Sequence, residues 1–174
     1  MPWVIAAIVI IVAVSALVLA VGSMLPKGHL VSRMAHFNRP PEEIWDTITA
    51  FGDQVSWRSD LLKTERLPNR GGREVWQETD RRGQTLTMET VELVPPRRLV
   101  RRIADENLAF GGSWTIQIAE FGEVTSLTIT ESGEIYNPVY RFVTRFITGY
   151  AATADQYLRA LAQKLGVDVN ITSV

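Results

Sequence analysis

The chain opens with a long apolar segment, whereas the remainder alternates between polar and apolar positions. From Trp3 to Val21 the segment contains a single polar side chain, Ser15, and no charge. Uncharged apolar runs of about 18 or more residues are typical of membrane-spanning helices. At about 1.5 Å per residue the run is roughly 28 Å long, close to the hydrocarbon thickness of a bilayer. We therefore predict an N-terminal transmembrane anchor over residues 1–25, with the span at 3–21.

A cleaved signal peptide is the alternative for this segment, with a cleavage site at Val18-Leu19-Ala20. Signal peptides, however, begin with a basic region and have a shorter apolar stretch of about 7–15 residues. Here the basic residues Lys27 and Arg33 follow the run, and the first acidic residue is Glu42. Because basic flanks stay on the cytoplasmic side, we predict a single-pass protein of the cell membrane with its domain on the cytoplasmic side.

After a short linker at 26–28, alternation with a period of two predicts strands separated by compact turns. A first strand over His29–Phe37 leads into a short helix at 41–50, and a second helical piece is expected at 53–57. Six further strands are predicted at 61–67, 73–79, 84–94, 97–103, 113–120 and 124–131. The last two are joined by a hairpin turn at 121–123, and the short spacing throughout indicates an antiparallel meander.

The pattern then changes to one long amphipathic helix. Asn137 is a good N-cap and Pro138 a good first position, and apolar residues recur every three or four positions as far as Leu165. Gly149 predicts a kink or a close packing point, because glycine inside a helix costs about 1 kcal/mol relative to alanine. Gly166 is a typical C-terminal stop, which leaves 167–174 as a tail.

Composition changes the picture once the N-terminal run is set aside. The chain is 46% hydrophobic, but outside the first 25 residues the fraction is about 40%, which is ordinary for one water-soluble domain. All charged side chains lie in this part, and they sum to a net charge of −1. Such a balance argues against nucleic acid as a partner. The sequence has no cysteine, so it predicts no disulfide.

The order of elements predicts an α+β fold in which a curved antiparallel sheet of about seven strands grips the long C-terminal helix. The opening strand running into Phe37-Asn38-Arg39-Pro40-Pro41-Glu42-Glu43-Ile44-Trp45, together with Trp57 and the Gly71-Gly72 turn, resembles the START-like or SRPBCC superfamily. Within it, the chain is most similar to the polyketide cyclase/dehydrase and lipid-transport group. The resemblance covers a domain at 29–166 and implies a helix-grip fold. The superfamily includes lipid carriers, hormone receptors, cyclases and ring-oxygenase subunits, so the fold leaves the function open.

Groups that commonly perform catalysis or bind metals give little signal. His29 and His36 are seven residues apart on one strand and therefore face opposite sides. Without cysteine they do not form a usual metal cluster, and we predict neither a metal nor a cofactor. Arg101 shares a strand face with Leu99 and Ile103, so it could face the concave side and bind a carboxylate or phosphate. Contact with solvent or with anionic lipid headgroups is the alternative.

Aromatic residues carry the binding hypothesis, because ligand pockets are mostly apolar with a few polar groups. Core packing is the alternative for each of them. The residues predicted to line a cavity between sheet and helix are Trp57, Trp76, Trp114, Ile116, Tyr140, Phe142, Phe146 and Tyr150.

These features together predict a membrane-tethered domain that binds a hydrophobic or amphipathic, lipid-like small molecule. Its partners would be the bilayer, through residues 3–21, and this ligand, and binding is favoured over catalysis. One alternative is a cyclase/dehydrase-type enzyme using the same cavity, with Arg101 and Tyr140 assisting proton transfer. The other is a scaffold for a protein partner.

Overall fold

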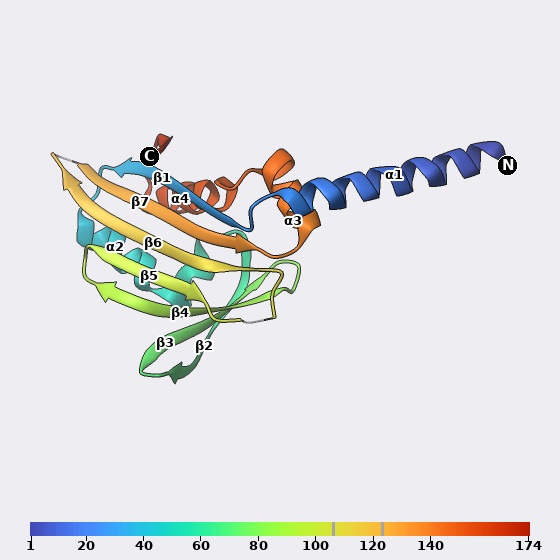
Figure 1. Cartoon of the computed structure of the whole chain (residues 1–174). Coiled ribbons are helices and arrows are strands. Elements are labelled where there is room, and N and C mark those ends of the chain that lie inside the picture. The colour runs from blue at the N-terminus through green and yellow to red at the C-terminus, as the bar shows by residue number, and fades with distance from the viewer. Residues whose placement is uncertain (106, 123) are drawn as a thin grey trace.

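A curved antiparallel sheet wraps around a helix, and a second long helix projects away from this domain (Figure 1). The computed structural model describes residues 1–105, 107–122 and 124–174. The described helical elements are α1 (Pro2–Met24), α2 (Pro41–Thr49), the 3₁₀ helix η1 (Phe51–Ser56), α3 (Pro138–Val143), the π-helical turn η2 (Thr144–Thr148) and α4 (Ala152–Leu165). The described strands are β1 (Gly28–Phe37), β2 (Leu61–Arg70), β3 (Arg73–Asp80), β4 (Thr85–Val94), β5 (Arg98–Ile103), β6 (Phe110–Phe121), β7 (Val124–Ile135) and β8 (Ile171–Ser173).

The strands of the described chain form one sheet in the order β2-β3-β4-β5-β6-β7-β1-β8. Strands β2 to β7 follow the chain order, which confirms the predicted meander, and β1 returns to pair with β7 along its whole length. Residue Glu123 of the predicted hairpin turn lies outside the described residues. The tail contributes β8, which pairs with β1 at positions 33–35. The alternation pattern missed this strand because three residues are too few to show a period.

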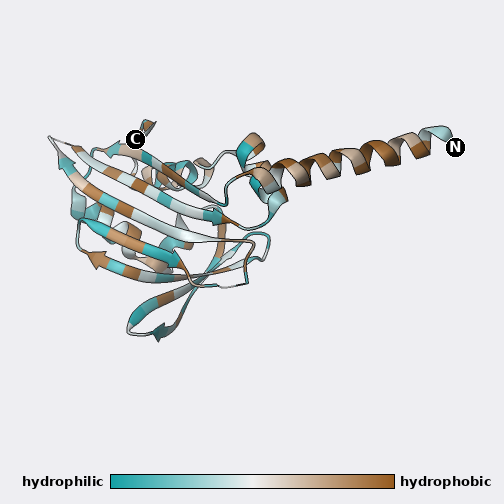
Figure 2. Ribbon diagram, viewed as in Figure 1, coloured by the Kyte–Doolittle hydropathy of each residue, from teal (hydrophilic) through white to brown (hydrophobic). Residues whose placement is uncertain are grey.

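The core lies between the concave face of the sheet and the two helices α2 and α4. Ile44 and Ile48 of α2, Leu158 and Leu161 of α4, and Ile129 of β7 are completely buried in it. Apolar and polar positions alternate along the strands, as Figure 2 shows by colour. This arrangement confirms the predicted α+β helix-grip fold.

The predicted C-terminal helix is divided at Gly149. This residue has φ 78° and ψ 156°, a region of backbone conformation that is essentially restricted to glycine. The helix therefore stops there and begins again at Ala152. The second half, α4, is the helix that the sheet grips, whereas the first half, α3 with η2, contacts α1 instead.

Helix α1 is long and apolar enough to cross a membrane and is almost entirely exposed. It is apolar around its whole circumference, and its ribbon in Figure 2 is brown to white along most of its length. Its last turns pack against α3. There, a Cβ atom on the buried Gly22 would overlap the carbonyl oxygen of Pro138, and Arg141 Nη1 donates to the carbonyl oxygen of Leu25 at 2.7 Å. The linker after α1 is thus held against the domain.

Candidate ligand-binding cavity

A cavity of about 230 Å³ lies between the concave face of the sheet, η1 and α4. Its wall is largely apolar, because inward-facing positions of the neighbouring strands β4, β5 and β6, the end of α2 and the start of η1 contribute to it. The apolar side chains in the wall are Ile48, Phe51, Leu86, Met88, Leu99, Ile103, Phe110, Trp114 and Ile116. The cavity can thus accommodate a compact apolar group.

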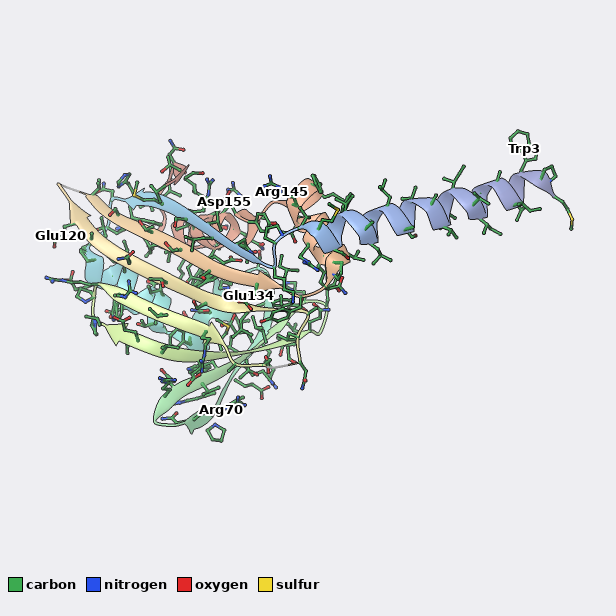
Figure 3. The ribbon with its side chains drawn as sticks, in the orientation of Figure 1. Trp3, Arg70, Glu120, Glu134, Arg145 and Asp155 are labelled. Carbon is green, nitrogen blue, oxygen red and sulfur yellow. The ribbon has the colours of Figure 1, made fainter. Side chains whose placement is uncertain are left out.

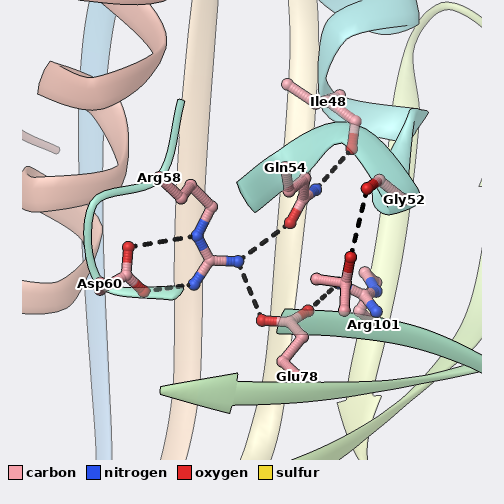
Figure 4. A network of polar contacts seen from close by, with 8 residues as sticks. Ile48, Gly52, Gln54, Arg58, Asp60, Glu78 and Arg101 are labelled. Atoms are coloured by element: carbon pink, nitrogen blue, oxygen red, sulfur yellow. Dashed lines mark hydrogen bonds and ion pairs between the residues drawn. The ribbon is translucent and has the colours of Figure 1, made fainter. Parts of the chain in front are cut away.

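A cluster of charged side chains closes the side of the cavity next to η1 (Figure 4). Glu78 of β3 accepts a hydrogen bond from Arg101 Nη1 at 2.6 Å and another from Arg58 Nη1 at 2.9 Å. On its other side Arg58 Nη2 donates to Asp60 at 2.7 Å, and Arg58 Nη1 also reaches Gln54 at 3.0 Å. The two arginines and two carboxylates balance in charge.

Arg101 is the member of this cluster with unused hydrogen-bonding capacity. The residue is 7% exposed, yet its Nε and Nη2 atoms have no hydrogen-bond partner among the described residues. Its guanidinium lies over the ring of Phe51, 4.2 Å from the centroid. Buried donors without partners are costly, and an acceptor oxygen beside them would remove that cost.

The protonation states of the buried groups follow from their surroundings. Burial acts to raise the pKa of Glu78, but the positive charges of Arg101 and Arg58 outweigh it and hold this pKa below its usual range. Burial raises the pKa of Tyr157, on α4 in the cavity wall, to about 12. Glu78 is therefore ionised and Tyr157 neutral near pH 7.

A second polar group lies in the wall on β7. Glu131 accepts a hydrogen bond from Trp114 Nε1 at 2.8 Å, and its other oxygen is 3.0 Å from His29 Nε2. The His29 ring stacks on Tyr150 with 4.5 Å between centroids. Among the described residues, no three His, Asp or Glu side chains are grouped so that they could hold a metal ion.

The structure brings together part of the residue set predicted from the sequence. Arg101, Trp114 and Ile116 line the cavity. Trp57 and Trp76 do not line the cavity themselves but pack against residues that do. The ring of Trp57 meets that of Tyr157 edge-on at 5.3 Å, and Trp76 packs against Phe51 at 6.0 Å.

The remaining predicted residues lie on or just after α3 and η2, away from the cavity lining. Tyr140 and Phe146 are about half exposed, and the ring of Phe142 packs against that of Phe146 at 4.9 Å. Tyr150 contacts His29, as described above. The reason is the break at Gly149, which directs this segment toward α1 rather than along the sheet.

Sequence reasoning did not identify Glu78, Arg58 and Tyr157 as cavity residues. Signals for two of them were present. Alternation places Glu78 on the same strand face as Trp76, and Tyr157 belongs to the apolar stripe of the C-terminal helix. Arg58 follows η1 in an irregular segment, where no period indicates which side it faces.

Comparison with known proteins agrees with this geometry. The family described as polyketide cyclase / dehydrase and lipid transport matches residues 29–166. A comparison with curated proteins finds no match.

Several solved structures are similar in fold. A conserved protein from Geobacillus kaustophilus has a TM-score of 0.66 at 14% identity, over 82% of this chain and 99% of its own. The Zhui aromatase/cyclase from a Streptomyces species has a TM-score of 0.65 at 14% identity, over 80% and 94%. A START superfamily protein from Mycobacterium smegmatis has a TM-score of 0.61 at 17% identity, over 79% and 97%. At these identities the likeness shows the fold, which is the predicted START-like one.

Proposed function

The chain belongs to the polyketide cyclase / dehydrase and lipid transport family, and from this premise we propose that it binds an amphipathic small molecule in the cavity while α1 anchors it in a membrane. The apolar part of the ligand packs against the wall formed by β4, β5 and β6. Its polar end carries a carboxylate. The cavity volume of about 230 Å³ is slightly below the common range for ligand pockets, so the ligand is compact.

The observation that carries this proposal is the unused donor pair of Arg101. The Nε and Nη2 atoms of a guanidinium form a planar fork that matches two acceptor oxygens. At Arg101 both atoms are buried and unpartnered among the described residues, and the side chain lies in a largely apolar wall. A ligand with an acceptor oxygen would remove this desolvation cost, whereas a pure hydrocarbon would leave it in place.

The protonation states favour binding over acid–base catalysis. A general acid or base works best with a pKa near the operating pH. The pKa of Glu78 is lowered by its two arginine neighbours, and the pKa of Tyr157 is raised to about 12. Neither group exchanges protons readily near pH 7.

An enzyme of the cyclase/dehydrase type is the second candidate. The observation that favours it is the neutral Tyr157 hydroxyl, which shares the cavity wall with Arg101. Together they could stabilise negative charge on a substrate carbonyl oxygen. Tyr140, the other residue predicted from the sequence for this role, is half exposed on α3 and away from the cavity lining.

The binding proposal is tested with decanoic acid and its methyl ester, using the full chain in nanodiscs and the change in tryptophan fluorescence. We expect the acid to bind about tenfold or more tightly than the ester, because a hydrogen bond to a charged group contributes about 1.5–3 kcal/mol. Arg101→Met removes this preference. The matched control Arg102→Met retains it, because Arg102 is half exposed, pairs with Glu89 on the neighbouring strand β4 and does not line the cavity.

Equal affinity for acid and ester in the parent chain would contradict the proposed recognition by Arg101. Native mass spectrometry of the full chain gives a second readout and should reveal a co-purified small molecule. Protein that is repeatedly empty and binds neither probe would argue against ligand binding. Turnover of a carbonyl substrate that is lost in Tyr157→Phe would support the enzyme instead.

A further inference from the structure

Helix α3 and turn η2 present apolar side chains to solvent on one face. Val139, Tyr140, Phe146 and Ile147 form this face, which we call the α3–η2 face. Phe146 is 58% exposed and Ile147 71% exposed. All four belong to one short helical segment, and each is more than a third exposed. A contiguous exposed group of this kind marks a contact surface rather than ordinary surface variation.

The position of α3 relative to α1 indicates what covers this face. Pro138, the first residue of α3, lies directly against Gly22, which follows the apolar run that ends at Val21. Val18 and Val21 are also partly shielded, in contrast to most of α1. If the run spans the bilayer, then α3 lies at the depth where the span ends. This depth is the boundary between headgroups and acyl chains.

The charges around the face agree with this depth. Arg145 is exposed between the apolar residues and lies close to the base of α1, as labelled in Figure 3. Lys27, in the linker after α1, is also exposed. The sequence has no acidic residue between Glu134 and Asp155. Basic residues among aromatic and aliphatic ones are typical of segments that lie in the surface of an anionic bilayer.

We propose that α3 and η2 form a second membrane contact, in which the α3–η2 face inserts among the lipid headgroups and upper acyl chains beside the end of α1. Arg145 binds lipid phosphate. This inference rests on the proposed anchoring by α1 and extends it, because the domain is then attached at two places. Tyr140 and Phe146 thereby contact lipid and not the cavity ligand.

The test uses site-specific fluorophores in the full chain, which contains no native cysteine. Four variants, each with one cysteine, carry a small dye: Phe146→Cys and Ile147→Cys on the face, Val12→Cys in the middle of α1, and Glu120→Cys as a control. Glu120 is exposed at the end of the sheet opposite α1 (Figure 3). Each protein is reconstituted in vesicles of phosphatidylcholine and phosphatidylglycerol, containing nitroxide lipids with the quencher either near the headgroup or deep in the acyl chain.

We expect shallow quenchers to reduce the fluorescence at positions 146 and 147 about twofold or more relative to position 120. Deep quenchers should act on position 12. Quenching at 12 together with values at 146 and 147 equal to those at 120 would overturn the second contact and leave the anchor intact. Absence of quenching at 12 would overturn the anchor and, with it, this inference. Fluorescence changes at 146 and 147 that depend on protein concentration and not on quencher would assign the face to a second copy of the chain and also overturn it.

Discussion

Glu78 is the residue that holds the charged side of the cavity together. It is buried, and it accepts hydrogen bonds from two guanidinium groups, those of Arg58 and Arg101. Without it, Arg101 would have no side-chain hydrogen-bond partner among the described residues and would keep only its cation–π contact with the ring of Phe51. A buried charge that loses its partner costs several kcal/mol.

Replacement of Glu78 by glutamine should therefore lower the free energy of unfolding by about 3 kcal/mol at neutral pH. The pKa of Glu78 is lowered in the folded state, so its ionised form contributes stability that is present above the ordinary pKa of about 4.5 and is lost as the pH falls below it. The difference between parent and variant should accordingly shrink below this pH. Chemical unfolding of the full chain in detergent micelles, followed by near-UV circular dichroism across pH 3–8, measures it.

Glu92→Gln is the matched control for this measurement. Glu92 pairs with Arg98 on a neighbouring strand, but both side chains are well exposed. Exposed pairs contribute at most about 1 kcal/mol. Equal destabilisation by the two substitutions at neutral pH would contradict the structural importance of the buried cluster.

The side of the sheet on which a side chain lies was predictable where the alternation of its neighbours along the strand determines it. Alternation with Leu99 placed Arg101 on the concave side, and the structure has it in the cavity wall. The partner of Arg101 was not predictable, because Glu78 lies on β3 and β4 separates the two strands. Contacts of this kind depend on the register of several strand pairs, which no short stretch of sequence specifies.

At the scale of elements, Gly149 decides the course of the C-terminal region. Its φ of 78° stops the helix, so α3 packs against α1 while α4 packs against the concave face of the sheet. The sequence predicted a kink here, and the apolar stripe continued through it without a change of period. The apolar residues of this region therefore have two different environments: Leu158 and Leu161 lie in the core, whereas Ile147 is exposed.

Gly149→Ala should destabilise the full chain by about 1–3 kcal/mol, because a Cβ is strained at this backbone conformation. Thermal unfolding in detergent micelles measures the effect as a decrease of several degrees in midpoint. Thr148→Ala is the control, since Thr148 is exposed and adjacent but lies in η2 before the break. Equal midpoints for the two variants would show that the break does not depend on glycine.

Most strands were predictable at this scale, and the short ones were not. The long strands β4 and β7 show enough alternating positions to reveal a period. The three-residue strand β8 depends on its pairing with β1, including a hydrogen bond from Arg33 to Ser173. That pairing joins the two ends of the domain, so local pattern does not contain it.

At the scale of the whole molecule, the contact between α1 and α3 decides how the domain is held. Gly22 lets the two backbones approach closely, and Arg141 donates to the Leu25 carbonyl oxygen at 2.7 Å. The sequence predicted a short tether at this point. The structure instead has a packed joint, which depends on residues more than a hundred positions apart.

Gly22→Ala should loosen this joint, because the added Cβ would overlap the Pro138 carbonyl oxygen. Spin labels at Val12→Cys and Glu120→Cys, read by pulsed electron paramagnetic resonance in nanodiscs, should give a narrow distance distribution in the parent and a broader one in the variant. Gly28→Ala is the control, since a Cβ there meets no atom within 4 Å. Distributions that are alike in all three proteins would contradict a rigid joint.

The packed joint between α1 and α3 also fixes the orientation of the domain about the axis of α1. A helix turns about 100° per residue, so if α1 spans the membrane as proposed, each side of α1 corresponds to one direction of the cavity in the membrane plane. A membrane protein that packs against one side of α1 would thereby determine which way the cavity faces. Every copy of the chain bound to that protein in the same way would present its cavity in the same direction relative to it. If α1 anchors the protein as proposed, rotation of this helix about its axis would rotate the domain with it.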